Sequence, residues 1–232
     1  MVRLGFSYSL LNVVYHNTLM FKLWYSRQSC YKDLIVNNNT HLVIEGFPRC
    51  ANTFAVVAFQ QAQHETINIA HHMHSEVQVV LGVKYKIPVL VLCREPAHAI
   101  ASLVTRHPHI SVGQALRRYC LFYNTVFDYY QSVVFADFSQ VTNDYASVIN
   151  RLNFRYSSEF CPYINSEASD KKIFDKIDEL NEMAEGGKRN MLARPDIDKA
   201  KLLETRVMEV MSHPYIAQAQ KLYSKIRKLT TI

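Results

Sequence analysis

The first chemical signal in this sequence is a cation followed by hydrogen-bonding side chains, directly after an apolar run. The run covers residues 41–45, and residues 46–54 then have the sequence Gly-Phe-Pro-Arg-Cys-Ala-Asn-Thr-Phe. This turn offers the guanidinium of Arg49 and the polar side chains of Asn52 and Thr53, which are groups that bind an anion. The turn is not a Walker A loop, because the G-x-x-x-x-G-K-[ST] spacing is absent.

A second cation follows residues 88–92, the most apolar run of the chain. Arg94 is followed by Glu95 and Pro96, and Ser102 lies eight residues after the arginine. A guanidinium at the end of a strand and a hydroxyl about two helical turns later can hold one anion together. Taken alone, each of the two arginine segments could instead use its arginine to tether a turn.

Three histidines, His71, His72 and His74, lie close together between these two segments. An imidazole titrates near neutrality, so each of them could take up a proton in a reaction. Two other interpretations stay open at this point. The histidines could lie on the surface at the start of a helix, or they could belong to a metal site, although we expect no metal.

The elements that must position these side chains alternate between strands and helices. Apolar runs predict strands at residues 41–45, 66–70, 88–92 and 132–136. Helical periodicity and start signals predict helices at residues 53–63, 75–83, 94–105, 112–130 and 144–152. This alternation predicts an α/β fold, a three-layer α/β/α arrangement with a parallel sheet. Ligands of such sheets bind at the carboxyl ends of the strands, which is where both arginine segments lie.

Both ends of the chain depart from this alternation. Residues 1–25 are apolar and aromatic, but polar residues interrupt them well short of a membrane span. We predict a helix packed on the domain there, with peripheral contact to a membrane as the alternative. The C-terminal part is rich in charges and predicts helices at 170–184 and 196–211. The predicted division is an N-terminal helical segment, residues 1–40, and a single domain, residues 41–232, with a helical C-terminal part.

The composition excludes several classes of protein. Of the 232 residues, 49% are hydrophobic and 20% are charged, which is too apolar for a disordered chain. The net charge of +6 comes without a long lysine or arginine run, so an anionic small ligand suits it as well, and we predict no nucleic-acid partner. The five cysteines form no C-x-x-C pair, so neither a disulfide framework nor a structural zinc is indicated. The predicted location is the cytoplasm.

In their order and separation, the two arginine segments resemble the signatures of the nucleotide-dependent sulfotransferase family. The first family signature is an aromatic residue, Pro, Lys or Arg, and then Ser-Gly-Thr-Thr at the start of a helix, and residues 47–53 are similar to it. The second is an apolar strand, Arg-x-Pro and a serine eight residues after the arginine, as in residues 94–102. A weaker likeness is the aromatic-x-Asp turn at residues 135–138. The resemblance covers about residues 41–156.

The resemblance implies the P-loop NTPase-like sulfotransferase fold and the donor 3′-phosphoadenosine-5′-phosphosulfate, with no metal. Arg49 would be the catalytic cation at the leaving phosphate. Arg94 and Ser102 would hold the 3′-phosphate of the donor, and Phe54 and Phe135 would stack on adenine or, alternatively, belong to the core. The residues implied to bind the donor are Cys50, Ala51, Asn52, Thr53, Phe54, Arg94, Ser102 and Phe135.

Members of this family use a histidine after the second strand as general base, which implies that role for His72 or, next, His71. The reaction implied is transfer of a sulfuryl group to a hydroxyl of a small molecule, lipid or carbohydrate. Cys50, Ala51 and Asn52 replace the usual Ser-Gly-Thr, so a nucleotide-binding or interaction protein without transfer activity is the alternative. A nucleotide kinase is less favoured, because no Walker lysine accompanies the turn.

Overall fold

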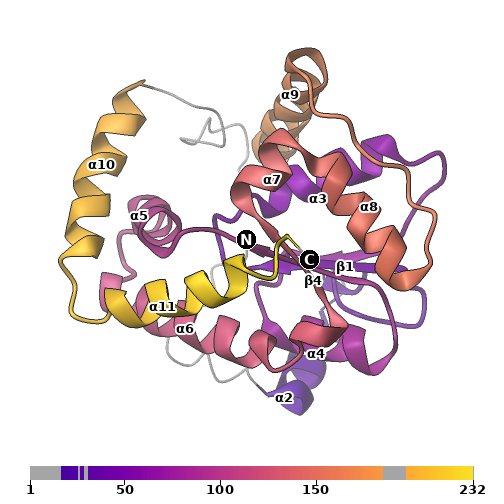
Figure 1. Ribbon diagram of the computed structural model, residues 1–232, viewed down its shortest axis with the longest axis horizontal. Helices are drawn as coiled ribbons and strands as arrows, with labels where there is room; N and C mark the ends of the chain where they lie inside the picture. The colour runs from indigo at the N-terminus through magenta and orange to yellow at the C-terminus, as the bar shows by residue number, and fades with distance from the viewer. Residues whose placement is uncertain (1–16, 26, 29–30, 185–196, 232) are drawn as a thin grey trace.

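A computed structural model of the chain describes residues 17–25, 27–28, 31–184 and 197–231 (Figure 1). Most of the predicted N-terminal helix, residues 1–16, lies outside the described residues. Within the described residues, no helix combines the length and the apolar character needed to cross a membrane.

Four short strands form one sheet in which all neighbours run parallel. They are β1 (Leu42–Gly46), β2 (Ile69–His71), β3 (Val89–Cys93) and β4 (Val134–Asp137), in the order β2-β1-β3-β4. The strand residues are almost all buried, on both faces of the sheet. This explains why the strands appear in the sequence as continuous apolar runs and not as alternating apolar and polar residues. The four predicted strands are confirmed, each displaced by at most three residues.

Helices cover both sides of this sheet, so the predicted α/β class is confirmed. Figure 1 shows α3, α7 and α8 on one side and α4 and α6 on the other. The core helices are α3 (Asn52–Ala62), α4 (Glu76–Lys84), α5 (Pro96–Arg106), α6 (Val112–Phe127), α7 (Phe138–Asn143) and α8 (Tyr145–Tyr156). The helix predicted at 112–130 ends at Phe127, where a short 3₁₀ turn, Tyr130–Ser132, leads into β4. The short helix α7 was not expected from the sequence.

The remaining helices come from the two ends of the chain. Near the N-terminus, α2 (Thr18–Tyr25) buries Phe21 and Tyr25 in the same core as the sheet. At the other end lie α9 (Glu167–Ala184), α10 (Ile197–Met211) and α11 (Ile216–Arg227). Helix α9 packs on α3, α10 on α5, and α11 on α6 (Figure 1). Helices α10 and α11 therefore pack around α5, whereas α9 covers α3.

The strand order creates one switch point in the sheet. From the central strand β1 the chain moves to β2 on one side, and it then returns to β3 on the other side. Gly46 at the end of β1 is in register with Leu92 of β3, so the two strands end side by side. In open parallel sheets a ligand binds in the crevice outside the carboxyl ends of such a pair of strands. Both arginine segments leave the sheet at this point.

Candidate functional site

The fold joins the two arginine segments directly. The Nε of Arg49 donates a hydrogen bond of 2.9 Å to the hydroxyl of Ser102, and an Nη of Arg94 donates one of 3.1 Å to the carbonyl oxygen of Arg49. These partners are 53 and 45 residues apart in the sequence. Three side chains that were singled out from the sequence therefore meet at the switch point between β1 and β3.

The turn after β1 passes very close to β3. A Cβ atom at Gly46 would lie 2.5 Å from the carbonyl oxygen of Leu92, so only glycine fits there. The side-chain Nδ2 of Asn52 donates a hydrogen bond of 3.1 Å to the carbonyl oxygen of Phe47 and closes the turn. Asn52 is buried, and its Oδ1 has no hydrogen-bond partner among the described residues. Its side chain thus shapes the turn and does not lie in an open site.

The N-terminus of α3 presents unpaired backbone N–H groups at this turn. Its N-cap residue, Ala51, has a left-handed φ of 66° and caps no N–H group with its side chain. The first N–H groups of a helix lack intrahelical acceptors and carry a partial positive charge. Arg49 also has a positive φ, of 71°. Strained backbone of this kind clusters at functional sites, and an anion is the partner that such a helix end accepts.

The positive charge at this site is greater than the sequence indicated. Burial, together with the nearby charges of Arg106 and Arg94, lowers the pKa of Arg49 to about 10. Arg49 remains a cation at neutral pH, and the positive charges of Arg94 and Arg106 act on it. Arg106 was not among the predicted site residues. It lies four residues after Ser102 on α5, a spacing that places two side chains on one face of a helix.

The thiol of Cys50 points into the core and not toward a ligand. Cys50 is fully buried, and its Sγ lies 3.5 Å from the hydroxyl of Tyr123. Burial raises the pKa of this thiol to about 12, so it stays protonated at neutral pH. Any contact of Cys50 with a ligand must come from its backbone N–H.

The two phenylalanines considered for adenine stacking are packed in the core. The ring of Phe54 contacts Tyr163 and Phe174, with ring centroids 6.2 and 5.7 Å away, and Phe135 is also buried. A different aromatic ring, from the turn at residues 135–138 but not considered for stacking, lies at the site itself. Phe138 stacks under the guanidinium of Arg94, 4.0 Å from its ring centroid. This contact holds the arginine in place without neutralising its charge.

The histidines lie beside the turn that follows β1. The Nε2 of His72 is 3.0 Å from the hydroxyl of Thr53, and its Nδ1 is hydrogen-bonded to the Nδ1 of His71. Burial lowers the pKa of His71 to about 4 and that of His72 well below 6.5. Both imidazoles are therefore neutral at physiological pH. The structure places none of the three on an open surface, and among the described residues no group of three or more metal-ligating side chains is found.

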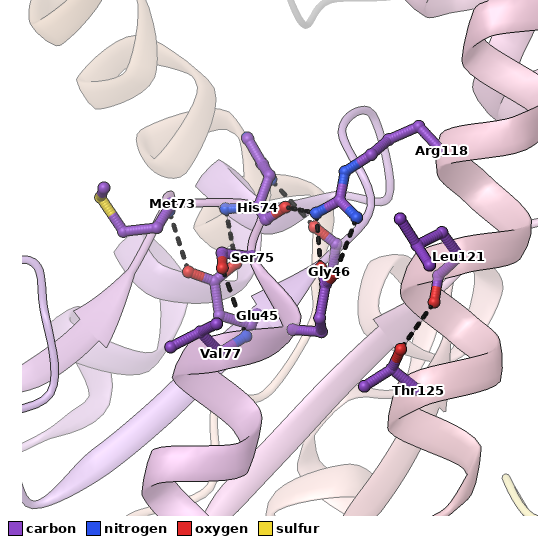
Figure 2. A network of polar contacts seen from close by, with 10 residues as sticks. Glu45, Gly46, Met73, His74, Ser75, Val77, Arg118, Leu121 and Thr125 are labelled. Atoms are coloured by element: carbon purple, nitrogen blue, oxygen red, sulfur yellow. Dashed lines mark hydrogen bonds and ion pairs between the residues drawn. The ribbon is translucent and has the colours of Figure 1, made fainter. Parts of the chain in front are cut away.

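A buried carboxyl group fixes the loop that carries His72. The two oxygens of Glu45, on β1, accept the backbone N–H groups of Met73 and His74 at 2.9 and 3.0 Å (Figure 2). His74 also contacts the Gly46 carbonyl oxygen through its Nδ1, at 2.9 Å. On the far side of the loop, Arg118 donates to the carbonyl oxygen of His74 at 2.9 Å and pairs with the buried Glu76. These contacts hold His72 and His74 at left-handed φ angles of 61° and 50°.

Glu45 gives this loop a testable pH dependence. Burial raises the pKa of Glu45 from 4.5 to about 8, although the two N–H donors limit the rise. The folded protein thus holds a proton that the unfolded chain has released, and the free energy of unfolding falls as pH rises through this interval. The histidines of this loop act in the opposite direction, because their lowered pKa values leave the unfolded chain with histidine protons up to about pH 7.5. The contribution of Glu45 is therefore measured as the difference in unfolding free energy between the wild-type protein and Glu45→Gln. Between pH 6.5 and 8 we expect this difference to fall by up to about 1.4 kcal/mol per pH unit, measured by urea denaturation.

The variant Glu45→Gln removes this titration. It should be less stable than the wild-type protein at pH 6.5, since an amide offers one acceptor oxygen in place of two, and this deficit should shrink as the pH rises to 8. The exposed Glu65→Gln is the matched control and should keep the slope of the wild-type protein. An unchanged slope in Glu45→Gln would assign the pH dependence to another group.

The site combines a cluster of cations, an uncapped helix N-terminus and a neutral imidazole at the carboxyl ends of β1 and β3. Such an arrangement can bind a phosphorylated ligand and can accept a proton beside it. No family model matches this chain, and no curated protein or solved structure matches it.

Proposed function

We propose that this protein is a sulfotransferase that moves a sulfuryl group from 3′-phosphoadenosine-5′-phosphosulfate to a hydroxyl of a small molecule, lipid or carbohydrate. The observation that carries the proposal is the pair of contacts from Arg49 to Ser102 and from Arg94 to Arg49, at the switch point of the sheet. The two segments with the likeness to sulfotransferases are thereby parts of one site. On this proposal the turn after β1 is a P-loop-like phosphate-binding turn in a three-layer α/β/α fold.

The donor would span the site from one phosphate to the other. Its 5′-phosphate would meet the N–H groups at the start of α3 and the Thr53 hydroxyl. Its 3′-phosphate would meet Arg94 and Ser102, and the Nη groups of Arg49, whose Nε stays on Ser102, would meet the bridging oxygen of the phosphosulfate. Arg106 would add positive charge to this side of the site. Neither Phe54 nor Phe135 has a role in this arrangement, because both rings are packed in the core.

The transfer is an in-line displacement at sulfur. The acceptor oxygen forms a bond to sulfur while the bond from sulfur to the bridging oxygen breaks, and that oxygen leaves with the 5′-phosphate. The proton of the acceptor hydroxyl goes to Nε2 of His72. This nitrogen lies 3.0 Å from the hydroxyl of Thr53, and it becomes available when that hydroxyl turns to the 5′-phosphate. Arg49 remains protonated and stabilises the charge that grows on the leaving oxygen.

A comparison of nucleotides tests the donor directly. A ligand that binds the folded state raises the melting temperature by mass action. We expect 3′-phosphoadenosine-5′-phosphate to raise it more than 5′-AMP, ADP or ATP, with or without Mg²⁺. A preference for ATP with Mg²⁺ would instead indicate phosphoryl transfer. Binding of the 3′-phosphorylated nucleotide without turnover of any hydroxyl acceptor would favour a nucleotide-binding protein that has no transfer activity.

Arg94 is expected to select the 3′-phosphate. The variant Arg94→Ala should weaken binding of 3′-phosphoadenosine-5′-phosphate by about 2–4 kcal/mol, since a charge-assisted pair in a crevice is lost. Binding of 5′-AMP should barely change. Titration calorimetry with both nucleotides measures the difference.

Arg94 also holds the carbonyl oxygen of Arg49, so the comparison needs a control. The exposed Arg117→Ala removes the same charge elsewhere and should leave both affinities unchanged. An equal loss for both nucleotides in Arg94→Ala would mean that this arginine acts by supporting the turn and not by contacting the 3′-phosphate.

A further inference from the structure

A groove of about 1040 Å³ lies at the opposite end of the sheet from the proposed donor site. It runs beside the edge strand β4, near the amino ends of β3 and β4, and is bounded by the C-terminal half of α8. Its volume is that of a pocket for a small molecule. Because the donor would bind at the carboxyl ends of the strands, the groove is a separate place in the molecule.

The wall of the groove is mainly apolar and aromatic. Phe154 is 92% exposed and Tyr130 is 43% exposed, although both are large apolar side chains. Tyr130 is held by stacking on Phe127, with ring centroids 5.6 Å apart. The apolar lining consists chiefly of Ile87, Tyr130, Val133, Phe154, Tyr156 and Leu229. Exposed aromatic side chains that converge on one groove are typical of a binding site and unusual on an unoccupied surface.

The charged residues of this lining are all cations. They are Lys86, Arg151 and Arg155, and none of the described lining residues is acidic. Lys86 and Arg155 are exposed at the rim, whereas Arg151 lies deeper in the wall. An apolar groove with only positive charges is complementary to a molecule that has an apolar body and an anionic group.

Arg151 provides the strongest indication of a ligand. One of its Nη atoms donates to the carbonyl oxygen of Phe135 at 3.1 Å, but the other is buried and has no hydrogen-bond acceptor. The acid whose charge acts on Arg151, Asp144, makes no ion pair with it and instead accepts from the backbone N–H of Ser147. Buried donors are nearly always paired in folded proteins, so an unpaired buried Nη on this half-buried arginine is costly. A carboxylate bound in the groove would supply the missing acceptor once the Arg151 side chain turns toward it.

The same arginine argues against a peptide strand as the occupant. A strand added to the edge of the sheet would need the outward-facing carbonyl groups of β4. The carbonyl oxygen of Phe135 in β4 already accepts from Arg151, and just before β4 the carbonyl oxygen of Ser132 accepts from the Tyr156 hydroxyl at 2.6 Å. The edge is therefore covered by side chains of α8, and a small molecule fits better than a chain.

We propose that this groove binds an amphipathic carboxylate, a molecule with an apolar chain and one carboxylate group. The chain would lie against Phe154 and Tyr130, and the carboxylate would pair with Arg151, with Lys86 contributing at the rim. This binding is independent of the proposed sulfotransferase activity, because no residue of the groove belongs to the donor site.

Titration calorimetry of the full chain with decanoate and with 1-decanol tests this proposal. The two probes share an apolar chain and differ in charge. We expect decanoate to bind about tenfold more tightly than decanol, since a charge-assisted pair forms only with the carboxylate. Equal affinity for the two probes, or no binding of decanoate, would overturn the proposal.

Three variants locate the binding. Arg151→Gln should weaken decanoate binding about tenfold and leave decanol unchanged, and Phe154→Ser should weaken both probes. If Arg151→Gln does not fold, Lys86→Asn serves in its place. Lys86 is exposed and has a φ of 59°, which asparagine tolerates, so this variant should fold and weaken decanoate binding several-fold.

Two further comparisons complete the test. The exposed Lys84→Asn, outside the groove, should not affect decanoate. Arg94→Ala should also leave decanoate binding unchanged, whatever it does to nucleotide binding, so failure of this proposal can be distinguished from failure of the donor site. Binding of decanoate that is insensitive to all groove variants would place the probe elsewhere and contradict the proposal.

Discussion

Arg49→Ala is expected to lower kcat by about 10²–10³-fold while nucleotide affinity falls by only a fewfold. The reason is that negative charge on the leaving oxygen develops only in the transition state, and the cation that stabilises it acts mainly there. Arg49 is suited to this task because its guanidinium is anchored to Ser102 through Nε alone, which leaves its Nη groups for a ligand. Single-turnover rates and calorimetry with 3′-phosphoadenosine-5′-phosphate separate the two effects.

The variant Arg49→Lys is the matched comparison. It keeps a cation at the same position and should retain part of the activity, although an ammonium group cannot bond to Ser102 and to a phosphate in the same fork geometry. Arg49 has a left-handed φ, and alanine and lysine are strained there to a similar degree, so backbone strain does not separate the two variants. If rate and affinity fall in proportion in Arg49→Ala, this arginine anchors the phosphate uniformly and has no special role in the transition state.

The sheet could be predicted from the sequence because the strands are buried on both faces. A run such as residues 88–92 has no polar side that could be confused with a surface helix, and the glycine and proline residues after β1 mark the turn. The pairing of Arg49 with Ser102 was within reach for a related reason. Parallel strands end at the same edge, so segments that follow two neighbouring strands lie close to each other.

Other features of the site depend on contacts that leave no local signal. Glu45 lies in the middle of an apolar segment, and its partners on the histidine loop are 28 and 29 residues away. Nothing in the sequence around His72 indicates a left-handed backbone, because the constraint comes from Glu45 and Arg118. At the end of β4, the hydroxyl of Tyr223 on α11 donates a hydrogen bond of 2.6 Å to the carboxylate of Asp137. These two residues are 86 positions apart in the sequence, so this contact leaves no local signal either. Such pairs are created by the fold and do not follow from periodicity.

Burial also changes the chemistry that residue types alone suggest. An exposed histidine would titrate near pH 6.5, and a base of that kind would lose its activity just below neutrality. His72 is enclosed by His71, His74 and Thr53, and burial together with the neighbouring imidazoles lowers its pKa well below 6.5. A base in this environment is already neutral in weak acid. It is ready to accept a proton throughout the physiological range, at the cost of being a weaker base.

His72→Asn is expected to slow transfer by roughly 10²–10⁴-fold, with donor affinity preserved. Asparagine is chosen because it tolerates the left-handed φ of 61° at this position and can still bond to Thr53, so the turn should keep its shape. His71→Ala is the matched control, and a larger loss there would move the base to His71. In the wild-type protein, kcat/KM for the donor should be level from about pH 6.5 to 8.5, because the base is neutral over that range. It should fall only at more acidic pH, as the imidazole becomes protonated. An acidic limb centred at pH 6.5, or a loss of activity with EDTA, would show that a buried His72 is not the base.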